Sequence, residues 1–314
     1  MKITVITVCY NSEKTIERAI QSVLAQDYND LEYLVIDGSS SDNTLEILER
    51  YKDKISLCIS EPDHGIYDAM NKGLGKATGE VVAFLNSDDW YAFGALKKVE
   101  EYFQKNKADI VSGNIFKWKD GKISKAVRTK LTGETIFFGV VCPHPAMFVK
   151  RKLFLELGGF DTSYKIAADT KWTANAYLSG AKILCVEDCF TYFSVGGVST
   201  TQIYETVKEE YEVLFRWAQE HHLEEMADRI SAYYIEGLKN LEKERSMEIA
   251  FEKKWEEIRN LFDYGKTYYI WGAGKRGNRC LHIFEKLGLP IQGFIDSGSL
   301  KKEVKGYPLI GPEE

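Results

Sequence analysis

The sequence predicts an α/β protein in which a mostly parallel sheet is flanked by helices. Three observations predict it. Apolar runs of strand length alternate with amphipathic segments over residues 1–90, polar turns follow several of these runs, and residues 203–262 contain no proline and are rich in Glu, Lys and Leu. Alternation of strands and helices is typical of a parallel sheet covered on both faces. We therefore expect a sheet domain over 1–202, a helical region over 203–262 and a small strand-helix-strand unit over 263–314.

The first strand and helix occupy residues 3–24. Ile3–Val8 is a β-branched run that fits a buried strand. Asn11 and Ser12 are residue types that cap helices, and the apolar side chains that follow recur on one helical face, namely Ile16, Ala19, Ile20, Val23 and Leu24. This spacing predicts a helix that packs its apolar face against the sheet.

The same alternation continues to residue 85. Runs rich in Val, Ile and Leu predict strands, and apolar residues three and four apart predict helices. In chain order the predicted elements are a strand at Tyr33–Ile36, a polar turn at Asp37–Ser41, a helix capped by Asp42, a strand at Ile55–Ile59, a helix at Ile66–Lys76 and a strand at Val81–Leu85.

Later segments of the first domain have a more β-like pattern. Lys119–Lys122 is a turn sequence between two predicted strands, Ile115–Trp118 and Ile123–Val127, which together predict a hairpin. A helix is expected at Asp169–Gly180 and one more strand at Lys182–Val186.

An acidic turn follows the strand that ends at Leu85. Asn86 and Asp88 would share one face of the strand, and Asp89 begins the turn. Such a cluster of oxygen atoms suits a hard divalent cation, whereas a helix N-cap or a turn pair explains the same residues equally well. Asp37 also follows a strand. Because ligands of parallel sheets bind beyond the carboxyl ends of the strands, we expect Asp37 and Asp88 to lie at one pocket.

Composition limits the partners and the compartment. The net charge of −6 argues against nucleic-acid binding, because phosphate backbones require a basic face, although it leaves room for a local basic patch. No stretch approaches the ~20 apolar residues that cross a bilayer, and the amino terminus lacks the features of a signal peptide. Six scattered cysteines fit reduced thiols better than disulfides or a zinc site. We expect a cytoplasmic protein.

Several stretches together resemble the family 2 glycosyltransferases over residues 3 to about 200. They are ITVITVCYNSEKTIERAIQSVLAQ, VIDGSSSDNT, DHGIYDAMNKGLGKATGEVVAFLNSDDW, HPAMFVKRKLFLELGGFD and AADTKW. The resemblance implies the nucleotide-diphospho-sugar-binding fold called GT-A and an inverting transfer of sugar. The sequence most resembles bacterial transferases that assemble O-antigen, capsule or exopolysaccharide.

The resemblance implies a nucleotide site at the ends of the first strands. Asp37 takes the place of the acid that reads the base edge, and a turn-bonding role for its carboxylate is the alternative. Lys72 is the cation available to the diphosphate, and a solvated surface lysine is the alternative. The implied nucleotide-binding residues are Thr7, Cys9, Tyr10, Asn11, Asp37, Ser39, Asp68, Lys72, Ser87 and Asp88.

The resemblance also implies a metal ion. Asn86-Ser87-Asp88 occupies the place of the family's DxD motif, with Asn in place of the first Asp. Asp88 and Asp89 are the implied ligands of Mn²⁺ or Mg²⁺, which would stabilise the negative charge that develops on the leaving diphosphate.

Asp169 stands where the family carries the base of its ED motif, with Ala168 in place of the preceding acid. The resemblance implies that Asp169 takes the proton of the acceptor hydroxyl, and a helix N-cap is the alternative. His144 and Trp172 are implied on the acceptor side, with a structural turn histidine as the alternative for His144. Phe193–Ser199 has the glycines of a loop that could close over the donor.

A glycine-rich turn marks the last part of the chain. Gly272–Gly277 reads GAGKRG after a predicted strand, and Asp296 ends the next strand, at the spacing of a dinucleotide-binding fingerprint. Residues 263–314 are too few for a complete doubly wound sheet. They resemble the small domain at the start of bacterial sugar acyltransferases. We expect a partial Rossmann-like βαβ unit that either binds a ligand or serves packing and assembly.

The sequence therefore predicts a metal-dependent glycosyltransferase that moves a sugar from a nucleotide-sugar donor, with a UDP-sugar preferred, to a glycan or lipid-linked acceptor. The alternatives are a sugar nucleotidyltransferase, which would release pyrophosphate, and a non-catalytic nucleotide-sugar-binding protein. The helical region allows a homodimer or a peripheral association with the inner face of the cell membrane. The donor sugar and the linkage depend on loops around residues 130–200 and are not predicted.

Overall fold

The computed structural model describes residues 1–126, 131, 133–139, 142–258, 265–286, 288–296 and 303–312. The chain forms two compact units, Met1–Leu238 and Lys239–Glu314, which are described separately. The predicted boundary at residue 262 lies outside the described residues. The division of the chain at 202 and 262 stays a prediction.

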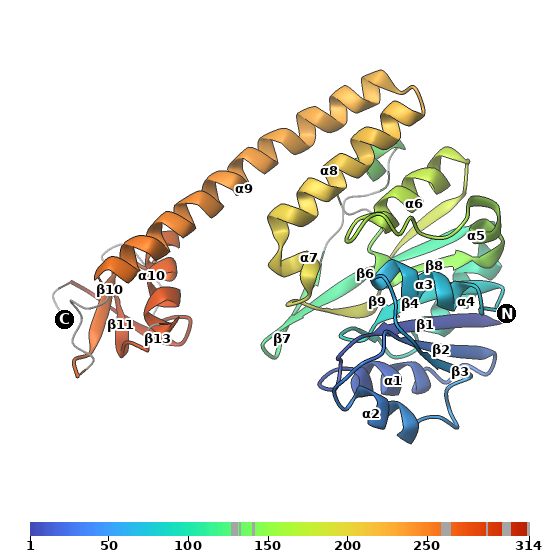
Figure 1. Cartoon of the computed structure of the whole chain (residues 1–314), viewed down its shortest axis with the longest axis horizontal. Coiled ribbons are helices and arrows are strands. Elements are labelled where there is room, and N and C mark those ends of the chain that lie inside the picture. Colours follow the sequence, from blue (N-terminus) through green and yellow to red (C-terminus); the bar gives the residue numbers. More distant parts are fainter. Residues whose placement is uncertain are drawn as a thin grey trace. The chain divides into compact units, whose positions relative to one another are not determined.

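A nine-stranded sheet forms the centre of the first unit (Figure 1). Its strand order is β3-β2-β1-β4-β8-β6-β9-β5, with β7 paired to β6. Strands β1 to β4 pair in parallel, and β8 lies antiparallel between β4 and β6. The strands are β1 (Ile3–Cys9), β2 (Leu31–Asp37), β3 (Leu57–Ser60), β4 (Val81–Asn86), β5 (Trp90–Tyr91), β6 (Ile110–Lys119), β7 (Lys122–Ala126), β8 (Met147–Lys150) and β9 (Ile183–Ser194).

Helices cover both faces of this sheet. Helices α1, α2 and α4 contribute to one apolar layer, and α3, α5 and α6 contribute to the other. The helices are α1 (Ile16–Leu24), α2 (Thr44–Arg50), α3 (Ile66–Leu74), α4 (Ala95–Lys105), α5 (Arg151–Leu157), α6 (Ala168–Leu178), α7 (Val198–Thr201), α8 (Ile203–Glu220) and α9 (Glu224–Ile258), with 3₁₀ turns η1 (Gly133–Phe137) and η2 (His144–Ala146). The predicted α/β fold is confirmed.

The central strand β1 sets the position of the polar turns. All seven of its residues are buried because β1 pairs with β2 on one side and with β4 on the other. The register places Cys9 beside Asp37 and Val8 beside Asn86. The carboxyl ends of β1, β2 and β4 therefore meet at one edge of the sheet, which is where parallel sheets bind ligands.

The apolar face predicted for α1 is confirmed. Ile16, Ala19, Ile20 and Val23 are all fully buried against the sheet. Burying one such branched side chain stabilises the fold by about 1.5–3 kcal/mol. The tight packing of α1 also fixes the residue on its polar side, Arg18, which belongs to the site described below.

The predicted cap of α1 is wrong. The helix begins at Ile16, and Asn11 and Ser12 lie in the preceding turn, where Asn11 has a φ of 48°. Asn11 Oδ1 accepts a hydrogen bond from Ser41 N at 2.8 Å, and Ser12 N donates to Thr44 Oγ1 at 2.7 Å. Both residues therefore fasten the turn after β1 to the turn after β2, and their local capping preference is overridden.

The predicted cap of α2 is wrong by one residue: the N-cap is Asn43, and Asp42, just before it, accepts a hydrogen bond from Thr44 N at its Oδ1 at 3.0 Å. The predicted hairpin is confirmed. The hairpin of β6 and β7 turns at Asp120 and Gly121, whose φ values are 48° and 76°. Val127, the last residue of the predicted second strand, lies outside the described residues.

Strand β9 is longer than the predicted strand Lys182–Val186. It runs from Ile183 to Ser194 because it pairs with β6 over most of its length and with β5 near its end. Pairing with two neighbours overrides the weak strand pattern of its second half. Phe193 and Ser194, expected in a loop, therefore belong to the strand, and α7 follows at Val198.

The predicted helical region contains α8 and α9, which confirms the helices expected there as far as residue 258. Helix α8 packs through an aromatic core, in which the Phe137 and Trp217 rings lie 4.9 Å apart. Trp217 Nε1 also donates a hydrogen bond to Asn175 Oδ1 of α6 at 2.7 Å. Among the described helices, none combines the length and the apolar character required to span a membrane.

The second unit contains a four-stranded sheet in the order β10-β11-β13-β12. Its elements are β10 (Tyr268–Trp271), α10 (Lys275–Lys286), β11 (Ile291–Ile295), β12 (Glu303–Val304) and β13 (Tyr307–Ile310). The parallel pair β10 and β11, joined by α10, is the predicted βαβ unit. Asp296 Oδ2 accepts a hydrogen bond from Ala273 N at 2.8 Å, so the acid of the fingerprint binds its own glycine-rich turn.

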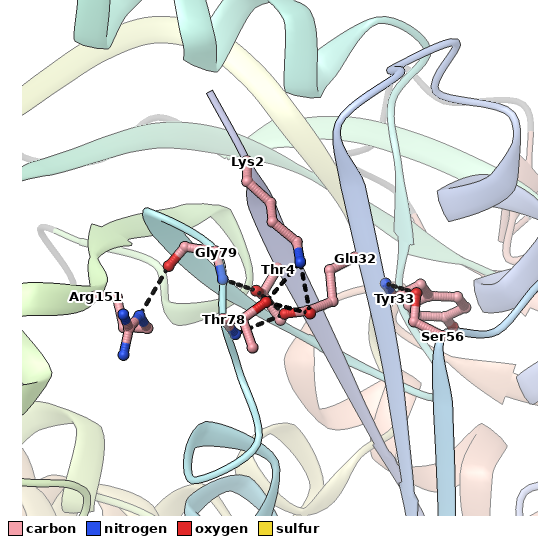
Figure 2. A network of polar contacts seen from close by, with 8 residues as sticks. All are labelled: Lys2, Thr4, Glu32, Tyr33, Ser56, Thr78, Gly79 and Arg151. Atoms are coloured by element: carbon pink, nitrogen blue, oxygen red, sulfur yellow. Dashed lines mark hydrogen bonds and ion pairs between the residues drawn. The ribbon is translucent and has the colours of Figure 1, made fainter.

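A buried carboxylate fastens the opposite edge of the main sheet (Figure 2). Glu32 Oε2 accepts hydrogen bonds from Thr4 Oγ1 at 2.6 Å and Thr78 N at 2.7 Å, and Glu32 Oε1 lies 2.9 Å from Lys2 Nζ. Arg151 Nε donates to Gly79 O at 3.0 Å beside this network. Burial opposes the charge of Glu32, but the hydrogen bonds outweigh it and lower the pKa of the carboxyl to about 2.

We predict that Glu32→Gln lowers the free energy of unfolding by about 2 kcal/mol at pH 7, because it removes a charged acceptor that joins β1, β2 and the turn before β4. Since the folded pKa of Glu32 lies below the unfolded value, this stabilisation is complete above pH 5 and is lost as the pH falls toward 2. Urea unfolding at pH 7, 5 and 3 measures it. The exposed Glu156→Gln is the control, and an equal stability of both variants at pH 7 would contradict the assignment.

Candidate functional site

Three polar turns form one surface at the carboxyl edge of the sheet. Asn11 N donates a hydrogen bond to Ser40 Oγ at 2.8 Å, which joins the turns after β1 and β2. The hydroxyl groups of Ser12 and Ser87 lie 2.8 Å apart, which joins the turns after β1 and β4. These hydrogen bonds link segments far apart in the sequence. They hold the turns after β2 and β4, which begin beside Asp37 and contain Asp88, at one edge of the sheet.

Asp37 is held inside its own turn. The residue is fully buried, and its carboxylate accepts hydrogen bonds from Ser40 Oγ at 2.5 Å, Ser40 N at 3.0 Å and Ser60 Oγ at 2.6 Å. Both oxygens are therefore engaged, as the turn-bonding alternative predicts. Cys9 Sγ lies 3.6 Å from Asp37 Oδ1, and burial raises the pKa of this thiol.

A second carboxylate lies nearby that was not among the predicted site residues. Asp63 Oδ2 is so close to Gly38 that a Cβ at position 38 would lie 2.4 Å from it, and the same Cβ would lie 3.5 Å from the Tyr10 ring. Asp63 Oδ1 accepts a hydrogen bond from Gly65 N at 2.9 Å. Tyr10 is 64% exposed. An open aromatic ring, a glycine backbone and a half-buried carboxylate thus share one place, which suits a flat base with an N–H edge.

Lys72 and Asp68, two of the predicted nucleotide-binding residues, support this surface. Lys72 Nζ lies 3.0 Å from Glu61 Oε1 and donates to Pro62 O at 2.7 Å, and Asp68 Oδ2 accepts from His64 N at 3.0 Å. These contacts fasten the loop that carries Asp63.

Thr7 and Ser39, two more of the predicted nucleotide-binding residues, differ in exposure. Ser39 is exposed with a φ of 61°, whereas Thr7 is buried and its hydroxyl lies 3.1 Å from Tyr33 OH. Thr7 therefore lies inside the sheet below the turn after β1, and Ser39 lies on the surface of the turn after β2.

Asp88 and Asp89 differ in burial and in hydrogen bonding. Asp88 is half-buried, and burial raises the pKa of its carboxyl although the Arg18 charge opposes this shift. Asp89 is fully buried, and burial together with the charge of Asp88 raises its pKa well above the ordinary value. Asp89 Oδ1 accepts a hydrogen bond from Ser194 N at 2.9 Å, whereas Asp89 Oδ2 has no hydrogen-bond partner among the described residues.

The positive charge of Arg18 acts on this acidic pair, and this residue was not predicted from the sequence. Its guanidinium lies 3.7 Å from the centre of the Trp90 ring and 5.1 Å from that of Trp118, and Nη2 donates to Asp88 O at 2.9 Å. The two rings hold the guanidinium by cation–π contact. The sequence offers one indication of this role: Arg18 is the single basic residue of α1.

The oxygen atoms at this edge fit a hard divalent cation. No group of three or more His, Cys, Asp or Glu side chains in the described part of the chain is arranged to hold a metal ion. Asp88 offers a carboxylate, and the buried Asn86 Oδ1 and Asp89 Oδ2 lack hydrogen-bond partners among the described residues. Mg²⁺ typically takes one or two protein carboxylates and completes its shell with substrate phosphates and water, and these donors suit that pattern.

A second polar group of residues surrounds Asp169. The residue lies in the first turn of α6, whose N-cap is Ala167, so the N-cap alternative for Asp169 is wrong. Asp169 Oδ1 lies 2.8 Å from Tyr67 OH, and Tyr67 OH lies 2.5 Å from Ile166 O. Tyr67 belongs to α3, which starts at the same edge of the sheet as Asp63.

The two residues implied on the acceptor side have different settings. His144 stacks on Phe84 at 5.6 Å, its Nε2 is buried without a hydrogen-bond partner in the described residues, and burial lowers the pKa of the imidazole while Asp169 opposes the shift. Trp172 is 2% exposed, donates to Gly158 O at 2.8 Å and stacks on Phe154 at 4.3 Å. His144 therefore lies near Asp169, whereas Trp172 is part of the core beneath it.

Residues 4–158 match the family model described as Glycosyl transferase family 2. An uncharacterized glycosyltransferase of Mycobacterium tuberculosis (strain H37Rv) is 31% identical over 188 residues, which cover 56% of this chain and 69% of that protein. The poly(ribitol-phosphate) beta-N-acetylglucosaminyltransferase TarS of Staphylococcus aureus (strain MW2) is 28% identical over 229 residues, 68% of this chain and 39% of its own length.

Two solved structures share the fold. TarS 1–349 of S. aureus in complex with UDP-GlcNAc superposes with a TM-score of 0.61 and 24% identity, and covers 73% of this chain and 71% of that one. The mannosyltransferase PcManGT of Pyrobaculum calidifontis in complex with GDP-Man and Mn²⁺ superposes with a TM-score of 0.57 and 17% identity, covering 92% and 85%.

The sheet with helices on both faces matches the GT-A fold of these two structures. The chain belongs to glycosyl transferase family 2. The family and the fold predicted from the sequence are both confirmed.

We predict that Gly38→Ala raises the KM for the nucleotide-sugar donor about tenfold, because the new methyl group must displace the Asp63 carboxylate from beside Tyr10. The backbone of Gly38 is not in the left-handed region, so the substitution itself is tolerated. Steady-state kinetics with varied donor measures the effect. Gly237→Ala, whose Cβ would meet nothing within 4 Å, is the control, and an unchanged donor KM for Gly38→Ala would remove Asp63 from the donor site.

Proposed function

We propose that this chain is an inverting glycosyltransferase that moves a sugar from a nucleoside diphosphate donor, preferably a UDP-sugar, to a hydroxyl group of a glycan or lipid-linked acceptor in the synthesis of a cell-surface polysaccharide. One observation carries the proposal: Asp88 follows β4 at the edge where the parallel strands β1, β2 and β4 end, Asp63 approaches Gly38 at the end of β2, and Asp169 is hydrogen-bonded to Tyr67 of α3.

The base of the donor binds at Tyr10 and Asp63. The exposed tyrosine ring stacks on the base, and the Asp63 carboxylate accepts a hydrogen bond from its N–H edge. The uracil imide provides such an N–H group. Support for uridine comes from the TarS structures, which contain UDP-GlcNAc or UDP, whereas PcManGT contains GDP-Man. Asp37 fixes the turn that carries Gly38, and its predicted contact with the base remains part of the proposal.

Asp88 would hold Mn²⁺ or Mg²⁺ by its carboxylate, and Asp89 and Asn86 would support it from the buried side. When bound, such an ion supplies positive charge to the diphosphate as the bond between sugar and phosphate breaks. Arg18 fixes the Asp88 backbone through its carbonyl group and adds a positive charge behind the acidic pair. Mn²⁺ in the PcManGT structure supports this choice of ion.

Asp169 takes the proton of the acceptor hydroxyl while the oxygen of that hydroxyl attacks the anomeric carbon. Tyr67 positions Asp169 in both of its protonation states. Before transfer, the hydroxyl proton of Tyr67 is shared between Ile166 O and Asp169 Oδ1. After transfer, the protonated Asp169 donates a hydrogen bond to the Tyr67 oxygen, while Tyr67 donates a hydrogen bond to Ile166 O.

The named activities of relatives support a surface polymer as the acceptor. TarS is named for poly(ribitol-phosphate), and a relative of Mycobacterium bovis for PGL/p-HBAD biosynthesis. Membership of family 2 favours sugar transfer over nucleotidyl transfer. O-antigen synthesis, a cytoplasmic location at the inner face of the membrane, and a homodimer remain predictions.

We predict that Asp169→Asn lowers kcat by about 10²–10⁴ and leaves donor binding unchanged, because the amide cannot take a proton but keeps the shape of the carboxylate. A panel of UDP-, GDP- and dTDP-sugars with Mn²⁺ first identifies the donor by nucleoside diphosphate release in the presence of acceptor. Donor binding is then measured by calorimetry. Wild-type turnover by Asp169→Asn would exclude Asp169 as the base, and pyrophosphate release by the wild type would favour the nucleotidyltransferase alternative.

We predict that Asp88→Asn lowers turnover by about 10² or more and raises the Mn²⁺ concentration required for half-maximal activity, since a neutral amide binds a hard cation less tightly than a carboxylate. Activity is titrated with MnCl₂ for each variant. The exposed Asp53→Asn is the matched control and keeps the wild-type curve. Identical Mn²⁺ titrations for Asp88→Asn and the wild type would remove Asp88 from the metal site.

A further inference from the structure

A glutamate of α8 binds the backbone that leads into α6. Glu209 Oε1 accepts hydrogen bonds from the N–H groups of Lys165 at 2.6 Å, Ile166 at 2.9 Å and Ala167 at 3.4 Å, which lie 42 to 44 positions earlier in the chain. Successive N–H groups that converge on one oxygen form an anion-binding concavity, and here the anion comes from another helix. Glu209 therefore fixes the position of the segment that leads into the helix of Asp169.

The start of α6 lacks a capping side chain at its N-cap. The N-cap is Ala167, whose methyl group cannot accept a hydrogen bond, and the first helical residue is Ala168. The start of a helix favours negative charge, because the N–H groups there have no partners within the helix. Glu209 supplies this charge from α8.

A second contact fixes α8 along α6. Trp217 Nε1 donates a hydrogen bond to Asn175 Oδ1 at 2.7 Å. Trp217 lies eight residues after Glu209, and Asn175 lies eight residues after Ala167, so both helices rise by about 12 Å between the two contacts. The two helices therefore run in the same direction, and α8 cannot slide along α6 without losing both contacts. Glu209 is thus held by a rigid element.

The peptide group between Ile166 and Ala167 connects Glu209 with the carboxylate of Asp169. Its N–H group, on Ala167, donates to Glu209 Oε1, and its carbonyl oxygen, on Ile166, lies 2.5 Å from Tyr67 OH. Tyr67 OH also lies 2.8 Å from Asp169 Oδ1. Hydrogen bonds at the two ends of one peptide group polarise each other, so the charge of Glu209 makes Ile166 O a stronger acceptor.

Tyr67 keeps its proton in this arrangement. The ring is buried, and burial raises the pKa of the hydroxyl well above its ordinary value, while the charges of Asp169 and Glu209 raise it further. The hydroxyl proton therefore has two acceptors, Ile166 O and Asp169 Oδ1. When the proton lies toward Ile166 O, the Asp169 carboxylate no longer receives a hydrogen bond from Tyr67 and is free to accept a different proton.

We propose that Glu209 is a positioning residue for the base: through the peptide group before α6 it draws the Tyr67 proton toward Ile166 O, which leaves Asp169 ready to take the proton of the acceptor hydroxyl. The inference rests on the proposed glycosyl transfer. It adds a residue of α8, which lies beyond the residues 4–158 matched by the family model, to the groups that support the reaction.

The test compares Glu209→Gln with the wild type in sugar transfer to methyl glycosides, with the donor identified from the panel of UDP-, GDP- and dTDP-sugars. Gln keeps an oxygen for the N–H groups and removes the charge. We expect kcat to fall about tenfold, and the KM values for donor and acceptor to stay within about twofold. Glu209→Asp keeps the charge and recovers part of the loss. Glu212→Gln, a half-exposed residue of α8 whose carboxylate lies 3.8 Å from Lys208 Nζ, is the control and keeps wild-type kinetics.

A double-mutant cycle with Tyr67→Phe separates this role from a general loss of structure. Because Glu209 acts through the Tyr67 hydroxyl, Glu209→Gln should change the kcat of Tyr67→Phe by less than about twofold. An unchanged kcat in Glu209→Gln, an equal loss in the Tyr67→Phe background, or a higher KM without a loss of kcat would overturn the role of Glu209. Should Glu209→Gln fail to fold, the same cycle with Glu209→Asp decides.

Amide hydrogen exchange tests the contact without any substrate. The N–H groups of Lys165 and Ile166 should exchange at least about tenfold faster in Glu209→Ala than in the wild type, and at the wild-type rate in Glu212→Gln. Equal exchange in Glu209→Ala and the wild type would overturn the inference and leave the proposed function standing. If the wild type transfers no sugar from any donor, the proposed function is wrong, and the inference fails with it.

Discussion

The burial of two adjacent carboxyl groups at the end of β4 is the constraint on which the site depends. Asp88 and Asp89 repel each other, and burial raises the pKa of both. The fold tolerates this because Ser194 N donates to Asp89 and because two tryptophan rings hold Arg18 nearby. A bound dication would offset the negative charge that the protein leaves only partly compensated, and would also attract the diphosphate.

A second polar group lies at the start of α6. Asp169 is hydrogen-bonded to Tyr67 of α3, and Glu209 of α8 accepts hydrogen bonds from the backbone N–H groups of the three residues before α6. In the proposed mechanism, the acidic groups after β4 suit a metal ion, whereas the Asp169 carboxylate suits proton transfer. The same residue type would then serve two tasks, according to its environment.

The sequence predicts the sheet well because its strands have local signals. β-Branched runs end in polar turns, so β1, β2 and β4 and the residues at their ends were found. The cap at Asn11 and Ser12 was wrong because these side chains bond to a turn about thirty residues away. Likewise, the full length of β9 depends on pairing with β6 and β5, which no local pattern indicates.

The site was only partly predictable for the same reason. Arg18 acquires its role through contacts with Asp88 and Trp90, about seventy residues along the chain, and Asp63 through its approach to Gly38. Glu209 has the sequence pattern of an ordinary helix surface, and its hydrogen bonds to the backbone of residues 165–167 distinguish it. Asp296 illustrates the opposite case, because its spacing fits a fingerprint while its side chain binds its own turn.

The most direct test of the central claim is a crystal structure of the chain with UDP and Mn²⁺. We expect uracil on the Tyr10 ring with its N–H edge at Asp63, and Mn²⁺ within about 2.2 Å of an Asp88 oxygen and of a diphosphate oxygen. A nucleotide bound elsewhere, or Mn²⁺ bound to the diphosphate with Asp88 turned away from it, would contradict the proposed site.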